Sequence, residues 1–214
     1  MFRAFVQARM SSSRFPGKVL APFRGFPLLH HVIERVARVI PRSRITVATS
    51  TEFTDDPLAG YAATLGVRVH RGPLDNVFER FRGCLAEYPC DWFYRVCADS
   101  PLIRPDLLGS LAHHADPAQA DIVTNVFPRT FPRGLSAELV RSAAFMAVDG
   151  RVLTPAEREH VTLHFYNHPD HYRIVNVPNP ERIPDGGDSY TVDTLADIHR
   201  LEDAVAAAGE NRCG

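Results

Sequence analysis

The chain has 214 residues, of which 45% are hydrophobic and 23% charged, and its formal net charge is -1 at pH 7. This length suffices for one α/β domain with its own core, but two full domains would be cramped. A net charge near zero argues against a protein that relies on non-specific nucleic-acid binding. Any phosphate-binding charge must therefore be local.

Membrane and secretory classes are also disfavoured. No apolar stretch approaches the roughly 20 residues that span a bilayer. The N-terminal stretch becomes charged too early to be a signal peptide. Cys84, Cys90, Cys97 and Cys213 form no C-x-x-C pair and no framework spacing. We therefore expect reduced thiols in a cytoplasmic protein.

Short apolar runs alternate with longer amphipathic segments as far as about residue 120, which is typical of βαβ units and a mostly parallel sheet. The periodicity predicts strands at 2–8, 44–50, 67–72 and 91–98. It predicts helices at 27–40, 55–66 and 75–88, the last capped by Asp75, and a turn and helix after residue 98. The first half therefore indicates a Rossmann-like α/β fold.

This alternation of apolar runs and amphipathic segments becomes less regular after residue 120. The stretch 121–141 is strand-like, but Pro128 and Pro132 interrupt it, as in an excursion from the main sheet. A helix is predicted at 154–169, with Thr154 as N-cap and Pro155 in its first turn. A strand at 172–178, a strand-like stretch at 189–194 and a helix from residue 195 follow. We expect a single domain over 1–214 with a projecting segment at about 125–170 that closes part of a pocket.

A polar, basic loop at residues 9–18 follows the first predicted strand. It contains Arg9, Arg14 and Lys18, and Lys18 is the single lysine of the chain. In open parallel sheets, ligands bind beyond the carboxyl ends of the strands, where amides, hydroxyls and basic side chains can hold phosphate. Val19 stands where a Walker A loop has Ser or Thr, and the first glycine of that motif is missing. The loop therefore predicts another kind of triphosphate site, the alternative being a solvated basic loop.

Two aspartates are predicted at strand ends on the same edge of the sheet. Asp99 follows the strand 91–98, and Asp193 ends the strand-like stretch 189–194. Two carboxylates beside a triphosphate loop suit a hard divalent cation, which binds carboxylate and phosphate oxygens. Either aspartate could instead cap the helix that follows it. The combination with Lys18 favours nucleotidyl transfer.

Several stretches carry a resemblance to a known family. They are "QARMSSSRFPGKVL", "ITVATSTEFTDDPLAGYAATLGVRVHRGPLDNVFERF", "RVCADSPLI", "NVFPRTFPRGLSAEL", "REHVT" and "YTVDTLAD", and together they extend over roughly residues 3–198. The sequence resembles sugar cytidylyltransferases of the spore coat polysaccharide biosynthesis (SpsF-like) family, which are related to CMP-KDO and CMP-sialic acid synthetases. The resemblance implies a nucleotidyltransferase-type sheet flanked by helices, and a homodimer with the segment at about 125–170 at the dimer contact.

The resemblance also implies an activity: Mg²⁺-dependent transfer of CMP from CTP to a sugar or sugar-like acid, with release of pyrophosphate. It implies catalytic roles for Arg9, Arg14, Lys18 and Asp99, and metal binding by Asp99 and Asp193. By the same resemblance, the nucleotide-binding residues are Ala8, Arg9, Ser12, Arg14, Lys18, Arg71, Asp75 and Arg80. The implied acceptor-binding residues are Asn125, Arg129, Glu138 and His160.

The sequence departs from the family pattern near the acceptor. Arg133 and Ser136 replace two acidic positions, which favours a more anionic acceptor, such as a phosphonate or a phosphorylated small molecule, unless Arg133 points into solvent. Cys97 and Ser100 replace the threonine and cysteine around Asp99. They are small enough to leave a metal site intact, although Cys97 is only a weak hydrogen-bond donor. A nucleotide-binding protein without turnover is the remaining alternative.

Histidines recur at 160, 164, 168 and 171 in the predicted helix. The spacing puts the first three on one helical face, where i, i+4 pairs can ligate zinc. No acidic residue separates His160 from His164, so this is not an H-E-x-x-H motif. The alternatives are an exposed helix face or dimer contact, and a substrate role for His160 alone.

Overall fold

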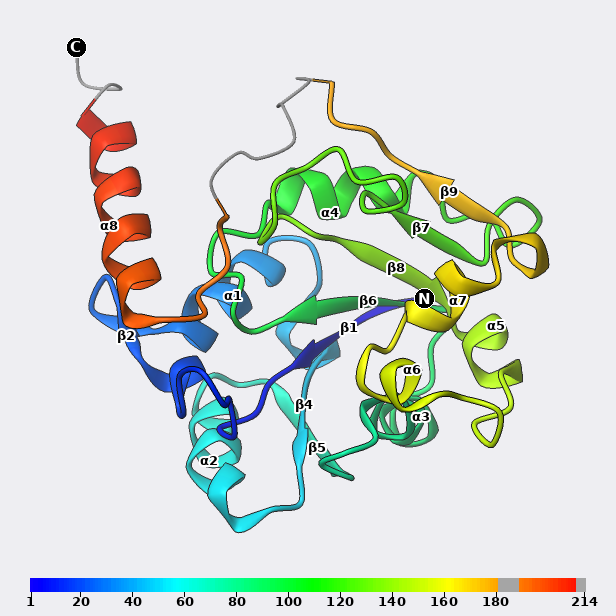
Figure 1. The fold of residues 1–214 in the computed structure, drawn as a ribbon, viewed down its shortest axis with the longest axis horizontal. Helices are drawn as coiled ribbons and strands as arrows, with labels where there is room; N and C mark the ends of the chain where they lie inside the picture. The colour runs from blue at the N-terminus through cyan, green and yellow to red at the C-terminus, as the bar shows by residue number, and fades with distance from the viewer. Residues whose placement is uncertain (181–188, 211–214) are drawn as a thin grey trace.

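The centre of the protein is a seven-stranded sheet, seen in a computed structural model that describes residues 1–180 and 189–210. The strand order is β5-β4-β1-β6-β8-β7-β9 (Figure 1). The first four strands are mutually parallel, β8 runs antiparallel to β6 and β7, and β9 is parallel to β7. The strands are β1 (Phe2–Gln7), β4 (Ile45–Ser50), β5 (Arg68–Gly72), β6 (Trp92–Cys97), β7 (Ile122–Thr124), β8 (Glu138–Arg141) and β9 (Ile174–Asn176). The predicted mostly parallel α/β fold is confirmed.

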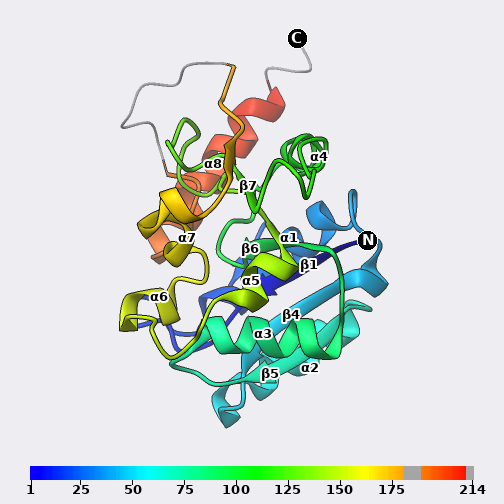
Figure 2. The same ribbon diagram turned by 90° about the vertical axis from the view of Figure 1, so that its right-hand side faces the viewer.

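Helices cover both faces of this sheet because alternate strand residues point to opposite sides. In β1, Ala4 and Val6 belong to the core on one face and Phe5 to the core on the other. The first face is covered by α1 (Leu28–Val36), α2 (Asp56–Thr64) and α4 (Pro105–Ala112). The second is covered by α3 (Val77–Glu87), α5 (Ser142–Ala147) and α7 (Leu163–Asn167). Figure 2 shows α4 and α3 on opposite sides of β1 and β6.

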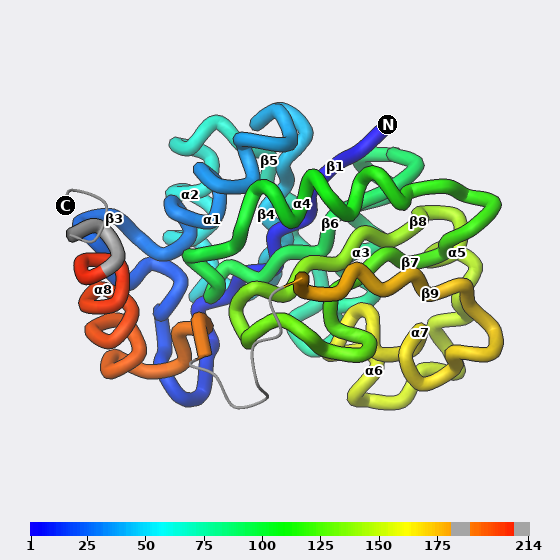
Figure 3. Tube along the Cα trace, turned by 90° about the horizontal axis from the view of Figure 1, so that it is seen from above, coloured from blue at the N-terminus to red at the C-terminus, as the bar shows by residue number. Residues whose placement is uncertain are grey.

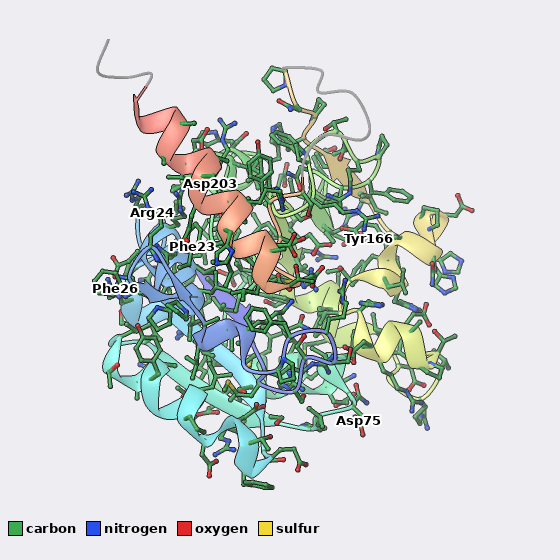
Figure 4. All side chains as sticks on the ribbon, turned by 60° about the vertical axis from the view of Figure 1, so that its left-hand side comes forward. Phe23, Arg24, Phe26, Asp75, Tyr166 and Asp203 are labelled. Carbon is green, nitrogen blue, oxygen red and sulfur yellow. The ribbon has the colours of Figure 1, made fainter. Side chains whose placement is uncertain are left out.

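The C-terminal helix α8 (Leu195–Glu210) packs against a small hairpin rather than against the main sheet. The hairpin is formed by β2 (Pro22–Phe23) and β3 (Phe26–Pro27). Ile198 and Leu201 of α8 share a core with Phe23. Figures 3 and 4 show α8 beside this hairpin. The remaining elements are α6 (Pro155–Glu159) and the 3₁₀ turns Lys18–Leu20, Arg42–Arg44, Phe53–Asp55 and Pro169–His171.

Two local predictions in the parallel half were wrong. The hairpin β2–β3 precedes α1, so that helix begins at Leu28 and is shorter than predicted. The N-cap of α3 is Asn76, whose side chain accepts a hydrogen bond from the Glu79 amide at 3.0 Å. Asp75 is exposed one residue earlier, so it does not cap the helix.

The second half shows three further differences. The predicted helix 154–169 is two short helices, α6 and α7, separated at 160–162, so His160, His164 and His168 do not share one helical face. The break turns the Thr162 hydroxyl toward Glu138, to which it donates at 2.7 Å. The stretch 189–194 is not a strand. Finally, β8 lies inside the central sheet, so that part of the segment 125–170 is no excursion.

Thr154 caps α6 as predicted, in a capping box with Glu157. Cys84, Cys90 and Cys97 are free thiols, and Cys213 lies outside the described residues. Within residues 1–180 and 189–210, no helix is both long and apolar enough to cross a membrane.

Candidate active site

The loop 9–18 is anchored at its start by a buried carboxylate. Asp55 accepts hydrogen bonds from the Met10 amide at 2.7 Å, from Thr49 Oγ1 at 2.9 Å and from the Ser50 amide at 3.0 Å. The Met10 carbonyl in turn accepts from the amide of Gly17 at 2.8 Å, which closes the loop on itself. Gly17 has φ 75°, a left-handed conformation that glycine adopts at little cost. This closure leads directly into the 3₁₀ turn that begins with Lys18.

Lys18 binds both predicted metal-site aspartates. Its ammonium group lies 2.8 Å from Asp99 Oδ2 and 3.0 Å from Asp193 Oδ1, and it also donates to the Val192 carbonyl at 3.0 Å. Its side chain is 11% exposed. Burial acts to lower the pKa of Lys18, but the two carboxylates outweigh it and hold that pKa above its usual value. The ammonium is therefore charged at neutral pH.

Backbone hydrogen bonds, not a strand, bring Asp193 to this position. The Val192 amide donates to the Asp99 carbonyl at 2.9 Å, and the Tyr190 amide donates to the Arg133 carbonyl at 2.7 Å. Thr194 caps α8 by exchanging hydrogen bonds with Asp197. Neither predicted metal ligand is thus a helix cap, since α4 begins only at Pro105, well past Asp99.

The two loop arginines bind acidic side chains at the rim of the site. Arg14 lies 3.0 Å from Asp193 and is 68% exposed. Arg9 pairs with Glu159, at the end of α6, at 2.7 Å. Ser12 Oγ accepts a weak hydrogen bond from the Phe15 amide at 3.4 Å. The loop therefore carries two cationic side chains that can exchange these partners for phosphate oxygens.

Three neighbouring cavities lie at the carboxyl ends of β1 and β6. The first, of about 300 Å³, is the phosphate cavity; it is lined by the loop 9–18, including Ala8, Arg9, Ser12, Arg14 and Lys18, and by Asp99. The second, of about 310 Å³, is lined by Asp99, Asp193, Arg129 and Arg133. The third, of about 270 Å³, is lined by Arg129, Glu138, His160 and Tyr166. These volumes suit small-molecule sites.

Arg95 of β6 lines all three cavities, although the sequence analysis did not single it out. It donates to Glu138 Oε2 at 3.1 Å and to Gln7 Oε1 at 3.2 Å. Glu138 is buried and also accepts from Thr162 and from the Tyr166 hydroxyl. The sequence offered one sign that Arg95 matters: a charged residue inside an apolar, buried strand requires a partner.

The predicted acceptor residues divide into two groups. Arg129, Glu138 and His160 line the third cavity. Asn125 is fully buried, donates to the Leu135 carbonyl at 2.8 Å and accepts from the Ala137 amide at 2.9 Å, so it holds the backbone of the loop. Arg133 is exposed at the edge of the second cavity.

Three of the predicted nucleotide-binding residues, Arg71, Asp75 and Arg80, line none of these three cavities. Arg71 donates to the carbonyls of Ser50 and Glu52, both at 2.8 Å. Arg80 is fully buried and donates to the Pro73 carbonyl at 2.7 Å. Asp75 is exposed (Figure 4). Arg71 and Arg80 therefore fix the loops after β4 and β5, and a nucleotide-binding role for them stays a prediction.

Burial raises the pKa of the Cys97 thiol to about 11, although nearby Arg95 opposes this effect. The thiol is therefore protonated and unreactive at neutral pH. Cys97 lines the first and second cavities, so it acts there as a small wall residue.

Comparisons with known proteins agree with this geometry. The sequence matches the cytidylyltransferase family over residues 4–207. The spore coat polysaccharide biosynthesis protein SpsF of Bacillus subtilis (strain 168) is 31% identical over 212 residues, which cover 96% of this chain and 86% of that protein. A solved cytidylyltransferase from Leptospira borgpetersenii serovar Hardjo-bovis has a TM-score of 0.89 and 27% identity, covering 96% of this chain and 87% of that one.

A more distant structure shows the same fold. It is a CMP:2-keto-3-deoxy-manno-octonic acid synthetase complexed with CTP, with a TM-score of 0.72 and 19% identity over 97% of this chain and 99% of that one. The family match covers nearly the whole chain, and the structure places a cationic loop around a cavity of about 300 Å³. The chain therefore belongs to the cytidylyltransferase family and is a CTP-dependent nucleotidyltransferase.

Proposed function

We propose that this enzyme transfers CMP from CTP to a sugar acid or a related anionic acceptor, with Mg²⁺ as its metal ion. The position of Lys18 carries the proposal. Its ammonium lies between Asp99 and Asp193, where the phosphate cavity meets the second cavity. This junction is where a nucleotide phosphate and an acceptor hydroxyl could meet. Cytoplasmic localisation and the homodimer stay predictions.

The two aspartates fit a divalent cation. They already converge on one cationic group, and each binds it through a single oxygen, Oδ2 of Asp99 and Oδ1 of Asp193. From the described residues, the other oxygen of each carboxylate receives at most the weak 3.4 Å contact that Ser100 makes with Asp99. Asp99 and Asp193 would hold Mg²⁺, which prefers carboxylate and phosphate oxygens. When bound, the ion supplies Lewis-acid polarisation of a phosphoryl oxygen.

The reaction would be an in-line displacement at phosphorus. The acceptor hydroxyl oxygen forms a bond to the α-phosphorus of CTP, the bond from that phosphorus to the oxygen bridging to the β-phosphate breaks, and pyrophosphate leaves. Arg9, Arg14 and Lys18 line the cavity that would hold the triphosphate, and their charges offset the negative charge that accumulates on pyrophosphate.

We assign acceptance of the hydroxyl proton to Asp99. Among the described carboxylates it is the one that lines both the phosphate cavity and the second cavity. Glu159 lines the first alone and Asp193 the second alone. A base must lie within hydrogen-bond reach of its proton, and only Asp99 faces both reactants in this arrangement.

The charge around the second and third cavities supports an anionic acceptor. Arg129 lines both cavities, Arg133 the second, and Arg95 both. Guanidinium groups bind carboxylates and phosphates through paired hydrogen bonds. Arg133 stands where related sequences carry an acid, so a phosphonate or a phosphorylated molecule is the second candidate acceptor.

The test is pyrophosphate release from CTP with Mg²⁺ and a panel of acceptors: sialic-type acids, KDO, neutral sugars, sugar phosphates and simple phosphonates. ATP, GTP and UTP serve as nucleotide controls. We expect release that requires CTP and one anionic acceptor. Arg14→Ala, a change at an exposed side chain, should raise the KM for CTP, whereas Arg151→Ala should not, because Arg151 is 90% exposed and pairs only with neighbouring Asp149 in the described structure.

Arg133→Asp distinguishes the acceptor classes. It should weaken the binding of a phosphorylated or phosphonate acceptor more than the binding of a sugar acid, because related sugar-acid enzymes carry an acidic residue at this position. Release with neutral sugars alone would refute the anionic acceptor. Absence of CTP-dependent release with every acceptor, together with equal binding of CTP and ATP, would refute the proposed reaction.

A further inference from the structure

A second cluster of metal-binding side chains lies outside the three cavities. Glu157 of α6 faces His164 of α7 and His168 at the end of that helix. The break between α6 and α7 creates this arrangement, because a continuous helix would place Glu157 and His164 two turns apart. The two helices contact each other, and Figure 1 shows both, in yellow, on the opposite side of the sheet from α8.

The distances suit a tetrahedral transition-metal ion. Glu157 Oε1 lies 3.2 Å from His164 Nδ1 and 3.7 Å from His168 Nε2. One ligand atom from each of the three residues lies within 4.8 Å of the others. With zinc–ligand bonds of about 2.0–2.1 Å, neighbouring ligand atoms of a tetrahedral site are about 3.3 Å apart. The two distances from Glu157 Oε1 are within about 0.4 Å of this spacing, and the two histidine nitrogens lie within 4.8 Å of each other.

The carboxylate is already oriented for this role. Its Oε2 accepts from the Thr154 amide and the Thr154 hydroxyl, both at 2.9 Å. Its Oε1 points to the two imidazoles and accepts from Asn167 Nδ2 at 3.1 Å. Outer hydrogen bonds of this kind fix metal ligands in place. Because the capping box uses Oε2, Oε1 of Glu157 is left to act as a monodentate metal ligand.

Burial and exposure also favour a bound ion. Glu157 and His164 have side chains that are 4% and 12% exposed, whereas His168 is 43% exposed. Glu157 and His164 are thus held rigidly, while water can reach the side of the cluster that His168 faces. The His164 and His168 ring centroids lie 4.5 Å apart, so the two imidazoles lie beside each other at the Glu157 carboxylate.

We propose that Glu157, His164 and His168 form a binding site for a divalent transition-metal ion of the zinc class. Two imidazole nitrogens and one carboxylate oxygen favour such an ion over Mg²⁺, whose preferred ligands are all oxygen. The ion ties α6 to α7 across the break at 160–162. The helix α6 also carries Glu159, the partner of Arg9, so the site stabilises one wall of the phosphate cavity.

The probe is Zn²⁺ alone, titrated calorimetrically into chelator-treated full-length enzyme with Mg²⁺ in large excess, so that any oxygen-ligand site at Asp99 and Asp193 is saturated. We expect one Zn²⁺ per chain and a thermal midpoint that rises with Zn²⁺. His164→Gln and His168→Gln should each weaken Zn²⁺ binding by about tenfold or more. His113→Gln, an exposed histidine elsewhere, should leave it unchanged.

His168→Gln is the decisive variant, because its exposed side chain can change without disturbing the core. Its unfolding without metal should match that of the unsubstituted enzyme, while the Zn²⁺-dependent rise in thermal midpoint is lost. Absence of Zn²⁺ binding under excess Mg²⁺, or equal Zn²⁺ binding by the His168→Gln and His113→Gln proteins, would overturn the proposal. Glu157 and the two histidines would then be an ordinary hydrogen-bonded cluster.

Discussion

Removing Lys18 should reduce stability because Asp99 then loses its cationic partner and Asp193 keeps only the exposed Arg14. Lys18→Ala deletes the ammonium that lies 2.8 Å from Asp99 and 3.0 Å from Asp193. Exposed ion pairs contribute about 0–1 kcal/mol, and removing one partner of a buried pair costs about 3–5 kcal/mol. The Lys18 side chain is 11% exposed and the two aspartates 26% and 27%, so this site lies between those limits.

We therefore expect a loss of about 2 kcal/mol in the free energy of unfolding. For a chain of this size, that loss lowers the thermal midpoint by about 4–8 °C. Urea titration of Lys18→Ala, Asp193→Asn and the double variant forms a double-mutant cycle. The double variant should be more stable than Lys18→Ala, because it no longer places the Asp193 carboxylate beside an uncompensated Asp99.

Mg²⁺ offers an independent check. Without the ammonium, Lys18 no longer competes with a divalent cation for the two carboxylates, so Mg²⁺ should raise the thermal midpoint of Lys18→Ala more than that of the unsubstituted enzyme. If Lys18→Ala unfolds at the same urea concentration as the parent and gains no additional stability from Mg²⁺, the ion-pair argument is refuted.

Three further substitutions test how the surrounding structure supports the site. Gly134→Ala should lower both the thermal midpoint and the rate of pyrophosphate release, because Gly134 has φ 87° and an added Cβ would overlap the Tyr190 backbone beside Asp193; equal activity would contradict this. Asp121→Asn should cost about 2 kcal/mol at pH 7. Burial opposes ionisation of Asp121, but hydrogen bonds from Arg173 and Arg141 lower its pKa to about 2. Its contribution is therefore complete above pH 4 and is lost as pH falls through 2, so urea midpoints of the two proteins should converge in acid; a constant difference would refute the assignment. Arg80→Ala should lower the urea midpoint by the equivalent of about 1–3 kcal/mol, because the Pro73 and Leu74 carbonyls lose a buried donor; a change in KM for CTP without a stability loss would indicate nucleotide contact instead.

The strand-end rule predicted the meeting of the loop 9–18 with Asp99, because both follow neighbouring parallel strands, β1 and β6. It also placed Asp193 at this edge, but for a wrong reason. No strand carries Asp193; two backbone hydrogen bonds hold the segment, one of them from the Val192 amide to Asp99. Such isolated contacts between distant residues leave no periodic pattern in a sequence.

Other features depended on tertiary context. The helical spacing of the histidines suggested one continuous helix, yet Thr162 leaves the helix to donate to Glu138. The grouping of His164 and His168 with Glu157 follows from that break and could not be derived from spacing alone. Arg95 was predictable in principle, since a lone charge in an apolar strand requires a partner, but nothing local identified that partner as Glu138.

The contact between Lys18 and Asp193 joins positions 175 residues apart, which has a consequence for synthesis of the enzyme. Translation proceeds from the N-terminus, so the ribosome completes every strand of the described sheet, the last ending at Asn176, before Asp193 is made. A chain that terminates between these points can assemble its sheet but cannot neutralise Lys18 with both carboxylates. With the role proposed for Asp193, catalytic competence is acquired only after Asp193 is made, later than every strand of the described sheet, and cleavage just before Asp193 should inactivate the enzyme while leaving that sheet intact.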